Sequence, residues 1–271
     1  MAQVIFLVLI LFYILAFSGY LMSFYGKEFK RVKPDLFFEL AFLLHTFFIF
    51  VEARESHVFL PLTTLKEVLI FFTWALSFVY SVLLRRVKHE MFGLVLLPFL
   101  ICFLAISSVM TEGKAIPIHY FENYHFLLHI LTAFFAYASF TLSFVAAALY
   151  LVQSHTLKSK QIGNLYQKLP SLKELEQFIF YSVIWGVFLL GVAIASGLFW
   201  SKSMFNTYVV REPKSISSIV TWIVYMSIVF LRNKSKISER RSVRFVFLAF
   251  ALVLFTFIGT SLFQTKLHVG M

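Results

Sequence analysis

The chain has 271 residues, of which 60% are hydrophobic and only 14% are charged, and its mean hydropathy is +0.86. A water-soluble domain of this length needs more polar surface to cover its core, so this composition excludes an ordinary soluble fold. The formal net charge of +11 would suit a nucleic-acid-binding protein. The basic residues are however spread over alternate loops, which excludes a nucleic-acid partner and points to the lipid bilayer.

Apolar runs of about 20 residues, long enough to cross about 30 Å of hydrocarbon as helices, recur along the whole chain. Inside lipid the backbone has to satisfy its own hydrogen bonds, so we interpret these runs as helices. The expected transmembrane helices are the eight runs 2–25, 34–53, 64–84, 91–111, 123–152, 177–199, 216–231 and 243–263. No long linker interrupts them, which predicts an all-α integral membrane protein with a single domain, residues 1–271. The first run lacks a basic leader and a small-residue cleavage site, so we expect it to be retained.

Lysines and arginines indicate how these helices cross the membrane. Four lie between the first and second runs, three between the third and fourth, four between the fifth and sixth, and six in the cluster from Arg232 to Arg244, which accounts for 17 of the 24 in the chain. The positive-inside rule makes this side cytoplasmic. We therefore expect both termini to be extracytoplasmic, together with the polar segment 197–225, in the cytoplasmic membrane of a bacterium.

Several kinds of chemistry are excluded by what the sequence lacks. Cys102 is the only cysteine, which excludes a disulfide, a paired-thiol redox site and a thiolate metal cluster. No nucleophile elbow, phosphate-binding glycine loop or His-Glu-x-x-His motif is present. Glu67 is one of few acidic residues within the expected spans, and a proton-coupled transporter usually has more. The pattern favours a protein that binds and orients a ligand over a stand-alone enzyme.

Histidines give the most specific signal, because most of them are expected on the outer side. These outer histidines are His57, His119, His125, His129 and His268. His125 and His129 are four residues apart, so they project from the same face of one helix. A neutral imidazole is a good ligand for haem iron, which is one interpretation of this group. The other is that these are interfacial histidines bonded to water, lipid or backbone, and spacing alone does not decide between the two.

Three segments resemble the cytochrome c assembly superfamily of haem-handling membrane proteins, which includes the CcsA/ResC, CcmC and HemX types. The first is LPLTTLKEVLIFFTWALSFVY, in which Glu67 and Trp74 fall on the family's glutamate and tryptophan. The second, LLHILTAFFAYASFTLSFVAAALYLVQ, is similar to the helix that carries the first outer haem-ligand histidine, here His129. The third, LFTFIGTSLFQTKLHVGM, resembles the segment that carries the second, here His268.

A fourth segment, 197–225, is similar to the family's tryptophan-rich WWD segment. Its sequence is GLFWSKSMFNTYVVREPKSISSIVTWIVY, and Trp200, Tyr208 and Lys214 fall on matching positions. The residues that stand where the family has tryptophans are Phe205, Val209, Arg211 and Ser217. Because an aromatic pair contributes about 0.5–1.5 kcal/mol beyond its buried area, the loss of these rings implies weaker stacking on a porphyrin. Segment 197–225 is thus expected to be a degenerate form of the haem-binding loop.

The resemblance implies a haem b site, with no other metal, that has His129 and His268 as axial ligands. Further residues expected to contact the haem are His125, His57, Trp200, Tyr208, Arg211 and Lys214, with His45 and Glu67 as minor additions. The cations among them, with Lys202, would pair with haem propionates or else be solvated loop charges. Phe230 stands where the family's synthases have an inner-site histidine, so a route for haem across the membrane is not implied.

Three functions follow from these features as alternatives. The first is an assembly factor that presents haem outside the membrane, with a CcsB-like membrane subunit and apocytochrome c as partners. The second is a HemX-type regulator of glutamyl-tRNA reductase, which would dock on the cytoplasmic loop between the fifth and sixth spans. The leucines proposed for that docking are Leu165, Leu169, Leu172 and Leu175. The third, from another class, is a small-solute transporter that uses the same bundle without haem.

Overall fold

The structure is a computed structural model that describes residues 2–26, 33–84, 90–110, 118–159, 168–208, 213–234 and 236–256. Within these ranges the chain forms eight α-helices and one short 3-10 helix. Seven of the α-helices are long and apolar enough to cross a membrane. The predicted class, an all-α multi-pass membrane protein, is confirmed, whereas the side on which each terminus lies stays a prediction.

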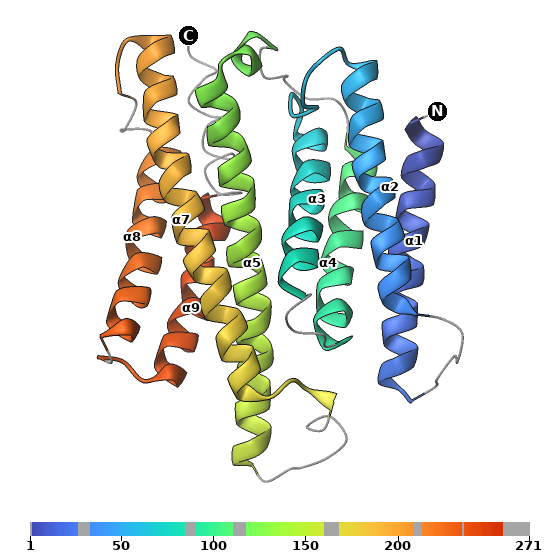
Figure 1. Cartoon of the computed structure of the whole chain (residues 1–271), viewed down its shortest axis with the longest axis vertical. Coiled ribbons are helices and arrows are strands. Elements are labelled where there is room, and N and C mark those ends of the chain that lie inside the picture. Colours follow the sequence, from blue (N-terminus) through green and yellow to red (C-terminus); the bar gives the residue numbers. More distant parts are fainter. Residues whose placement is uncertain are drawn as a thin grey trace. The chain divides into compact units, whose positions relative to one another are not determined.

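Two compact units make up the chain (Figure 1). Unit 1 is Met1–Glu122 with Ile162–Pro170, and unit 2 is Asn123–Gln161 with Ser171–Met271. The helices of unit 1 are α1 (Ala2–Phe24), α2 (Pro34–Glu55), α3 (Leu65–Leu84) and α4 (Glu90–Val109), followed by the 3-10 helix η1 (Ile118–Glu122). Those of unit 2 are α5 (Tyr124–Lys158), α7 (Leu172–Phe205), α8 (Pro213–Asn233) and α9 (Glu239–Leu254). The prediction of a single domain over 1–271 stays a prediction.

Helices α5 and α7 are longer than the apolar runs from which they were predicted. They contain 35 and 34 residues, where 123–152 and 177–199 were expected. At 1.5 Å per residue each is about 50 Å long, well beyond the hydrocarbon thickness of about 30 Å. The start of α7 explains part of the difference, because Ser171 and Glu174 form a reciprocal capping box there. Hydropathy locates only the lipid-exposed stretch of a helix and misses such polar extensions.

The eighth expected span is present as α9, but its position differs from the prediction. It begins at Glu239 rather than at residue 243 and is described for 16 residues. The rest of the expected span, up to residue 263, lies outside the described residues. As described, α9 is therefore too short to count among the membrane-crossing helices.

Unit 1 contains a small polar network in its core, where α1, α2 and α3 meet. The Tyr13 hydroxyl lies 3.2 Å from Nδ1 of His45 and 2.9 Å from the Ser77 hydroxyl. All three side chains are fully buried. The Tyr13 hydroxyl, the Ser77 hydroxyl and Nδ1 of His45 therefore have partners where water is absent. Nε2 of His45 is buried without a hydrogen-bond partner among the described residues.

The core of unit 2 is built on close contact between α5, α7 and α8. Phe140 of α5 stacks on the buried ring of Tyr225 of α8, with ring centroids 4.0 Å apart. Gly186 of α7 allows this, because a Cβ atom there would lie only 2.5 Å from the Phe140 ring. Trp222 of α8 donates from Nε1 to the Val187 carbonyl at 3.0 Å. These contacts hold the three helices in a fixed register.

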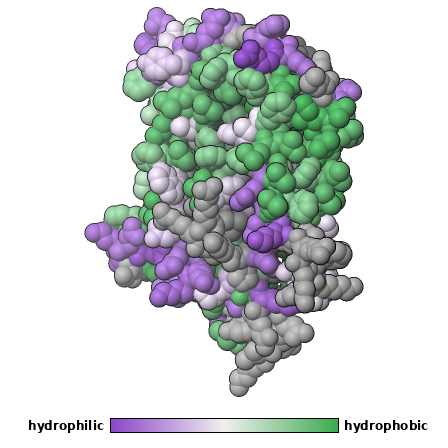
Figure 2. Space-filling view, turned by 45° about the vertical axis from the view of Figure 1, so that its right-hand side comes forward, coloured by the Kyte–Doolittle hydropathy of each residue, from purple (hydrophilic) through white to green (hydrophobic). Residues whose placement is uncertain are grey.

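The surface agrees with a membrane environment. On the face shown in Figure 2, hydrophobic side chains gather in a broad area with hydrophilic ones toward its ends. Large apolar side chains on several helices are exposed, for example Leu7 of α1 at 67%, Phe188 of α7 at 60% and Leu248 of α9 at 65%. Such side chains contact lipid at no cost in free energy, whereas water would disfavour so much apolar surface.

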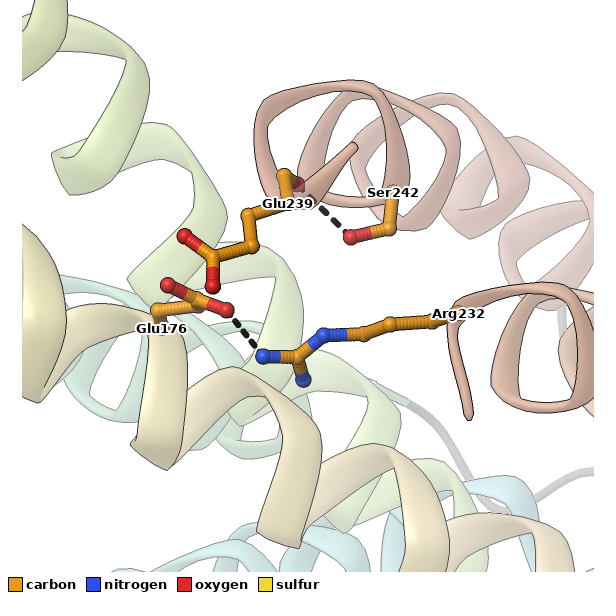
Figure 3. A network of polar contacts seen from close by, with 4 residues as sticks. All are labelled: Glu176, Arg232, Glu239 and Ser242. Atoms are coloured by element: carbon orange, nitrogen blue, oxygen red, sulfur yellow. Dashed lines mark hydrogen bonds and ion pairs between the residues drawn. The ribbon is translucent and has the colours of Figure 1, made fainter. Parts of the chain in front are cut away.

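A charged cluster joins three helices of unit 2 (Figure 3). Arg232, in the last turn of α8, forms an ion pair with Glu176, in the first turns of α7. The Glu239 carboxyl of α9 lies beside that of Glu176, and the Ser242 hydroxyl donates to the Glu239 carbonyl at 2.6 Å. The Arg232 and Glu176 side chains are only 22% and 10% exposed, so this ion pair is shielded from water.

Replacing Arg232 with methionine should destabilise unit 2 by about 2 kcal/mol, because the Glu176 carboxylate would remain shielded without its cation. The double variant R232M/E176Q removes both charges and should recover most of that loss. Unfolding in detergent, followed by circular dichroism, measures both effects. A double variant that is less stable than R232M would contradict the proposed role of the ion pair.

Candidate functional site

The start of α5 is tied to the end of α7. Asn123 caps α5, since its side-chain oxygen accepts from the backbone N–H of His125 at 2.9 Å. The Asn123 side-chain nitrogen also donates to the Ser203 hydroxyl of α7 at 3.2 Å. The first turns of α5 therefore face the last turns of α7. His125 and His129, in those first turns, lie beside α7.

His129 is held in a defined orientation by this packing. Its Nδ1 lies 2.7 Å from the Ala193 carbonyl oxygen of α7. A carbonyl oxygen can only accept, so Nδ1 carries the proton, and in the neutral ring the lone pair is on Nε2. Metal-binding histidines use the same arrangement, in which a backbone carbonyl fixes the tautomer and the ring orientation. Nε2 of His129 is therefore the ring nitrogen whose lone pair is available to a ligand.

Gly197 makes room for this imidazole. A Cβ atom at position 197 would lie 2.7 Å from Nδ1 and 2.9 Å from Cε1 of His129. Both distances are shorter than any ordinary carbon contact, so a side chain here would displace the ring. Ala193 and Gly197 are four residues apart and form a small-residue face on α7 against which the ring of His129 lies.

Aromatic rings surround the histidines at this end of unit 2. His125 stacks with Phe199, with centroids 5.7 Å apart and planes 26° from parallel. Trp200 packs on Phe126 at 4.8 Å and meets Phe205 edge to face at 5.7 Å. Phe205 stands where the family has a tryptophan, so part of the aromatic surface is retained by phenylalanine.

Two lysines bring positive charge to the same end. Lys214, in the first turn of α8, acts electrostatically on the His129 imidazole. Lys202, in the last turn of α7, donates to the Asn206 carbonyl at 3.1 Å and lies 5.6 Å from the ring centroid of Tyr208. The ring of Tyr208 is 56% exposed. A half-buried imidazole, aromatic rings and ammonium groups are the features that would suit a flat, apolar, anionic ligand.

Some of the residues predicted for this site lie in unit 1, and others lie outside the residues that the structure describes. His268 and Arg211 lie outside the described residues. His57 and His119 are exposed and belong to unit 1, so they are described apart from His129. Segment 197–225 was expected to be a loop, yet α7 continues to Phe205 and α8 begins at Pro213. Most of this segment is therefore helix, which is why Trp200 packs inside unit 2.

Two minor candidates have structural partners in unit 1. The Glu67 carboxylate accepts from the backbone N–H groups of Thr63 and Thr64 at 2.6 and 3.0 Å, and the Thr64 hydroxyl accepts from the Glu67 N–H. This is a capping box at the start of α3, which the spacing T-x-x-E already indicates. His45 belongs to the core network with Tyr13.

The proposed leucine docking surface is largely closed. Leu169 and Leu175 are 6% and 0% exposed, so they are part of the cores of their units. Leu165 lies outside the described residues. Leu172 is partly exposed, so a partner on this loop would have to recognise side chains other than Leu169 and Leu175.

Sequence reasoning missed the residues that position His129. The Ala193 carbonyl is a backbone group, which no residue type reveals, and Phe126 and Phe199 are ordinary apolar residues of membrane helices. Gly197 could have been found from its four-residue spacing to Ala193, a small-xxx-small pair typical of close helix contacts. Gly197 was assigned both to the end of the expected span 177–199 and to the start of the segment 197–225. Its role in helix packing was therefore not considered.

The chain is similar to several known proteins over most of its length. Residues 62–268 match the family model described as cytochrome C assembly protein. A protein named HemX from Brevibacillus brevis is 28% identical over 256 residues, which cover 92% of this chain and 90% of that protein. A cytochrome c biogenesis protein CcsA from Guillardia theta is 24% identical over 267 residues, covering 90% and 88%. Protein HemX of Bacillus subtilis (strain 168) is 26% identical over 174 residues, covering 64% and 63%.

Replacing Gly197 with alanine should destabilise the contact between α5 and α7 by about 1–3 kcal/mol, because the new methyl group overlaps the His129 ring. The double variant G197A/H129A removes that overlap and should be more stable than G197A alone. Thermal unfolding in detergent measures this order of stability. Ala195→Ser, at an exposed position of the same helix, serves as the control.

Proposed function

The chain belongs to the cytochrome c assembly protein family, and we propose that it binds haem b through His129 at the outer face of the bacterial cytoplasmic membrane and presents it for cytochrome c assembly. The observation that carries the proposal is the hydrogen bond between Nδ1 of His129 and the Ala193 carbonyl. It leaves Nε2 as the ligand atom, in a setting of aromatic rings and lysines that fits a porphyrin with propionates.

Each group of residues has a role in this proposal. His129 and His268 would hold the haem iron through their imidazole nitrogens. Phe126, Phe199 and Trp200 provide the aromatic surface beside the histidines. The ammonium of Lys214, together with Lys202 and Arg211, pairs with the propionates.

Catalysis of a bond-making step is not required of the chain. Bound haem would supply the iron for the imidazole and the groups to which an apocytochrome is attached. The residues of this chain would bind and orient the haem and keep it in one place. This raises the effective concentration of haem for its reaction with a partner protein. In this role a CcsB-like membrane subunit and apocytochrome c are the partners.

A second candidate function is that of a HemX-type regulator of glutamyl-tRNA reductase. The observation that favours it is that proteins named HemX are similar to this chain over most of its length. Segment 197–225 has fewer tryptophans than the family's tryptophan-rich segment. Weaker stacking on haem suits a protein that senses haem reversibly better than one that holds it firmly. Membership of a cytochrome c assembly family supports either of these haem-related roles over haem-free solute transport.

The protein purified with haem should show a Soret band that is weakened at least tenfold in His129→Ala and in His268→Ala, because each variant removes one axial ligand. His155→Ala, an exposed histidine near the other end of α5, is the matched control and should keep the band. Absorbance at equal protein concentration measures the bound haem. A full Soret band in His129→Ala would falsify the assignment of the ligand.

Affinity capture from membranes separates the two functions. An assembly factor should recover a CcsB-like membrane protein, and a regulator should recover glutamyl-tRNA reductase. Because the regulator would respond to haem, its capture of the reductase should change several-fold in His129→Ala, whereas capture of a membrane subunit should not. Recovery of neither protein under conditions that preserve the Soret band would contradict both roles.

A further inference from the structure

A pocket of about 330 Å³ lies in unit 1, where the end of α1 meets the start of α4. Its lining combines polar and apolar side chains: Tyr20, Ser23, Phe24, Glu90, Met91, Leu94 and Lys168. Pockets that bind small ligands have volumes of about 300–1,000 Å³, so this one suits a small group rather than a porphyrin. The residues that α1 contributes precede the region 62–268 that matches the family model, so the pocket is not built from family segments alone.

Two opposite charges face this pocket without neutralising each other. Glu90 accepts a hydrogen bond from the Ser23 hydroxyl, and Lys168 donates to the Phe24 carbonyl. Among the described residues, Glu90 and Lys168 form no ion pair with one another. Both residues line the pocket, so the second carboxylate oxygen of Glu90 and two ammonium N–H groups of Lys168 are available to an occupant. The complementary ligand carries an ammonium group and an anionic oxygen group.

The pocket lies at the depth of lipid headgroups. Ser23 and Phe24 are the last residues of a membrane-crossing helix, and Glu90 is the first residue of another. Helices of this kind end where the hydrocarbon gives way to the headgroups. Tyr25, which follows α1, is 68% exposed, as is usual for an aromatic residue in that layer. On the apolar side the pocket is lined by Met91 and Leu94, which suits the start of an acyl chain.

We propose that this pocket binds the headgroup of phosphatidylethanolamine. Lys168 contacts the phosphate, and Glu90 accepts hydrogen bonds from the primary ammonium group. A choline headgroup has no N–H to donate to Glu90, and a glycerol headgroup has no positive charge for it. The pocket therefore selects among phospholipids by pairing both charges of a single headgroup.

Native mass spectrometry of the full chain in detergent tests this proposal. The protein is mixed with equal amounts of phosphatidylethanolamine, phosphatidylcholine and phosphatidylglycerol of the same acyl chains. The unmodified protein should retain phosphatidylethanolamine in preference to the other two. Glu90→Gln and Lys168→Met should each weaken that binding about tenfold, the loss expected for one charge-assisted contact.

Matched controls separate this site from general lipid contact. Glu55→Gln and Lys158→Met change exposed charges outside the pocket and should leave the preference unchanged. Circular dichroism verifies that each variant is folded, and Glu90→Asp is the substitute if Glu90→Gln unfolds. Equal retention of the three lipids by the unmodified protein would overturn the proposal. So would displacement of the lipid by free phosphoethanolamine at equal concentration, because the ligand would then come from solution.

Discussion

One hydrogen bond, from Nδ1 of His129 to the Ala193 carbonyl, sets the orientation of the imidazole on which the proposed haem site depends. It fixes the tautomer of a half-buried imidazole and leaves a single nitrogen for a metal. The bond can form only because Gly197 allows α5 and α7 to approach closely around the ring. That approach depends in turn on Asn123, which caps α5 and also bonds to Ser203 of α7. The orientation of the His129 ring thus follows from the packing of α5 on α7.

The sequence was sufficient for the membrane class and for the approximate positions of the eight α-helices that the structure describes, because lipid solvation imposes long apolar runs. The ends of α5 and α7 could not be predicted from hydropathy, since polar turns and caps such as Ser171 with Glu174 extend them into water. His129 was proposed as a ligand because its position matches the ligand helix of a known family. Its partner Ala193 could not be found in the same way, because a backbone carbonyl becomes visible only when the packing of α7 is known.

The tryptophan-rich segment shows how a motif can change without losing its place in the fold. Trp200 and Trp222 occupy positions inside unit 2, where Trp200 packs on Phe126 and Trp222 bonds to the Val187 carbonyl. Phe205 keeps an edge-to-face contact with Trp200. Trp200, Trp222 and Phe205 thus serve helix packing, whereas Val209 and Arg211, which also stand where the family has tryptophans, lie outside the described residues. Such a pattern is compatible with a protein that keeps the family's architecture and holds its ligand less firmly.

The length of α5 links two regions of unit 2 that differ in chemistry. His129 lies in the second turn of the helix, and Tyr150, several turns further along, interacts electrostatically with Glu176 and Arg232 of the charged cluster. An uninterrupted α-helix transmits tilt and axial displacement along its length, because its backbone hydrogen bonds resist bending. The imidazole near one end of α5 and the tyrosine near the other therefore keep a separation set by the helical rise of about 1.5 Å per residue.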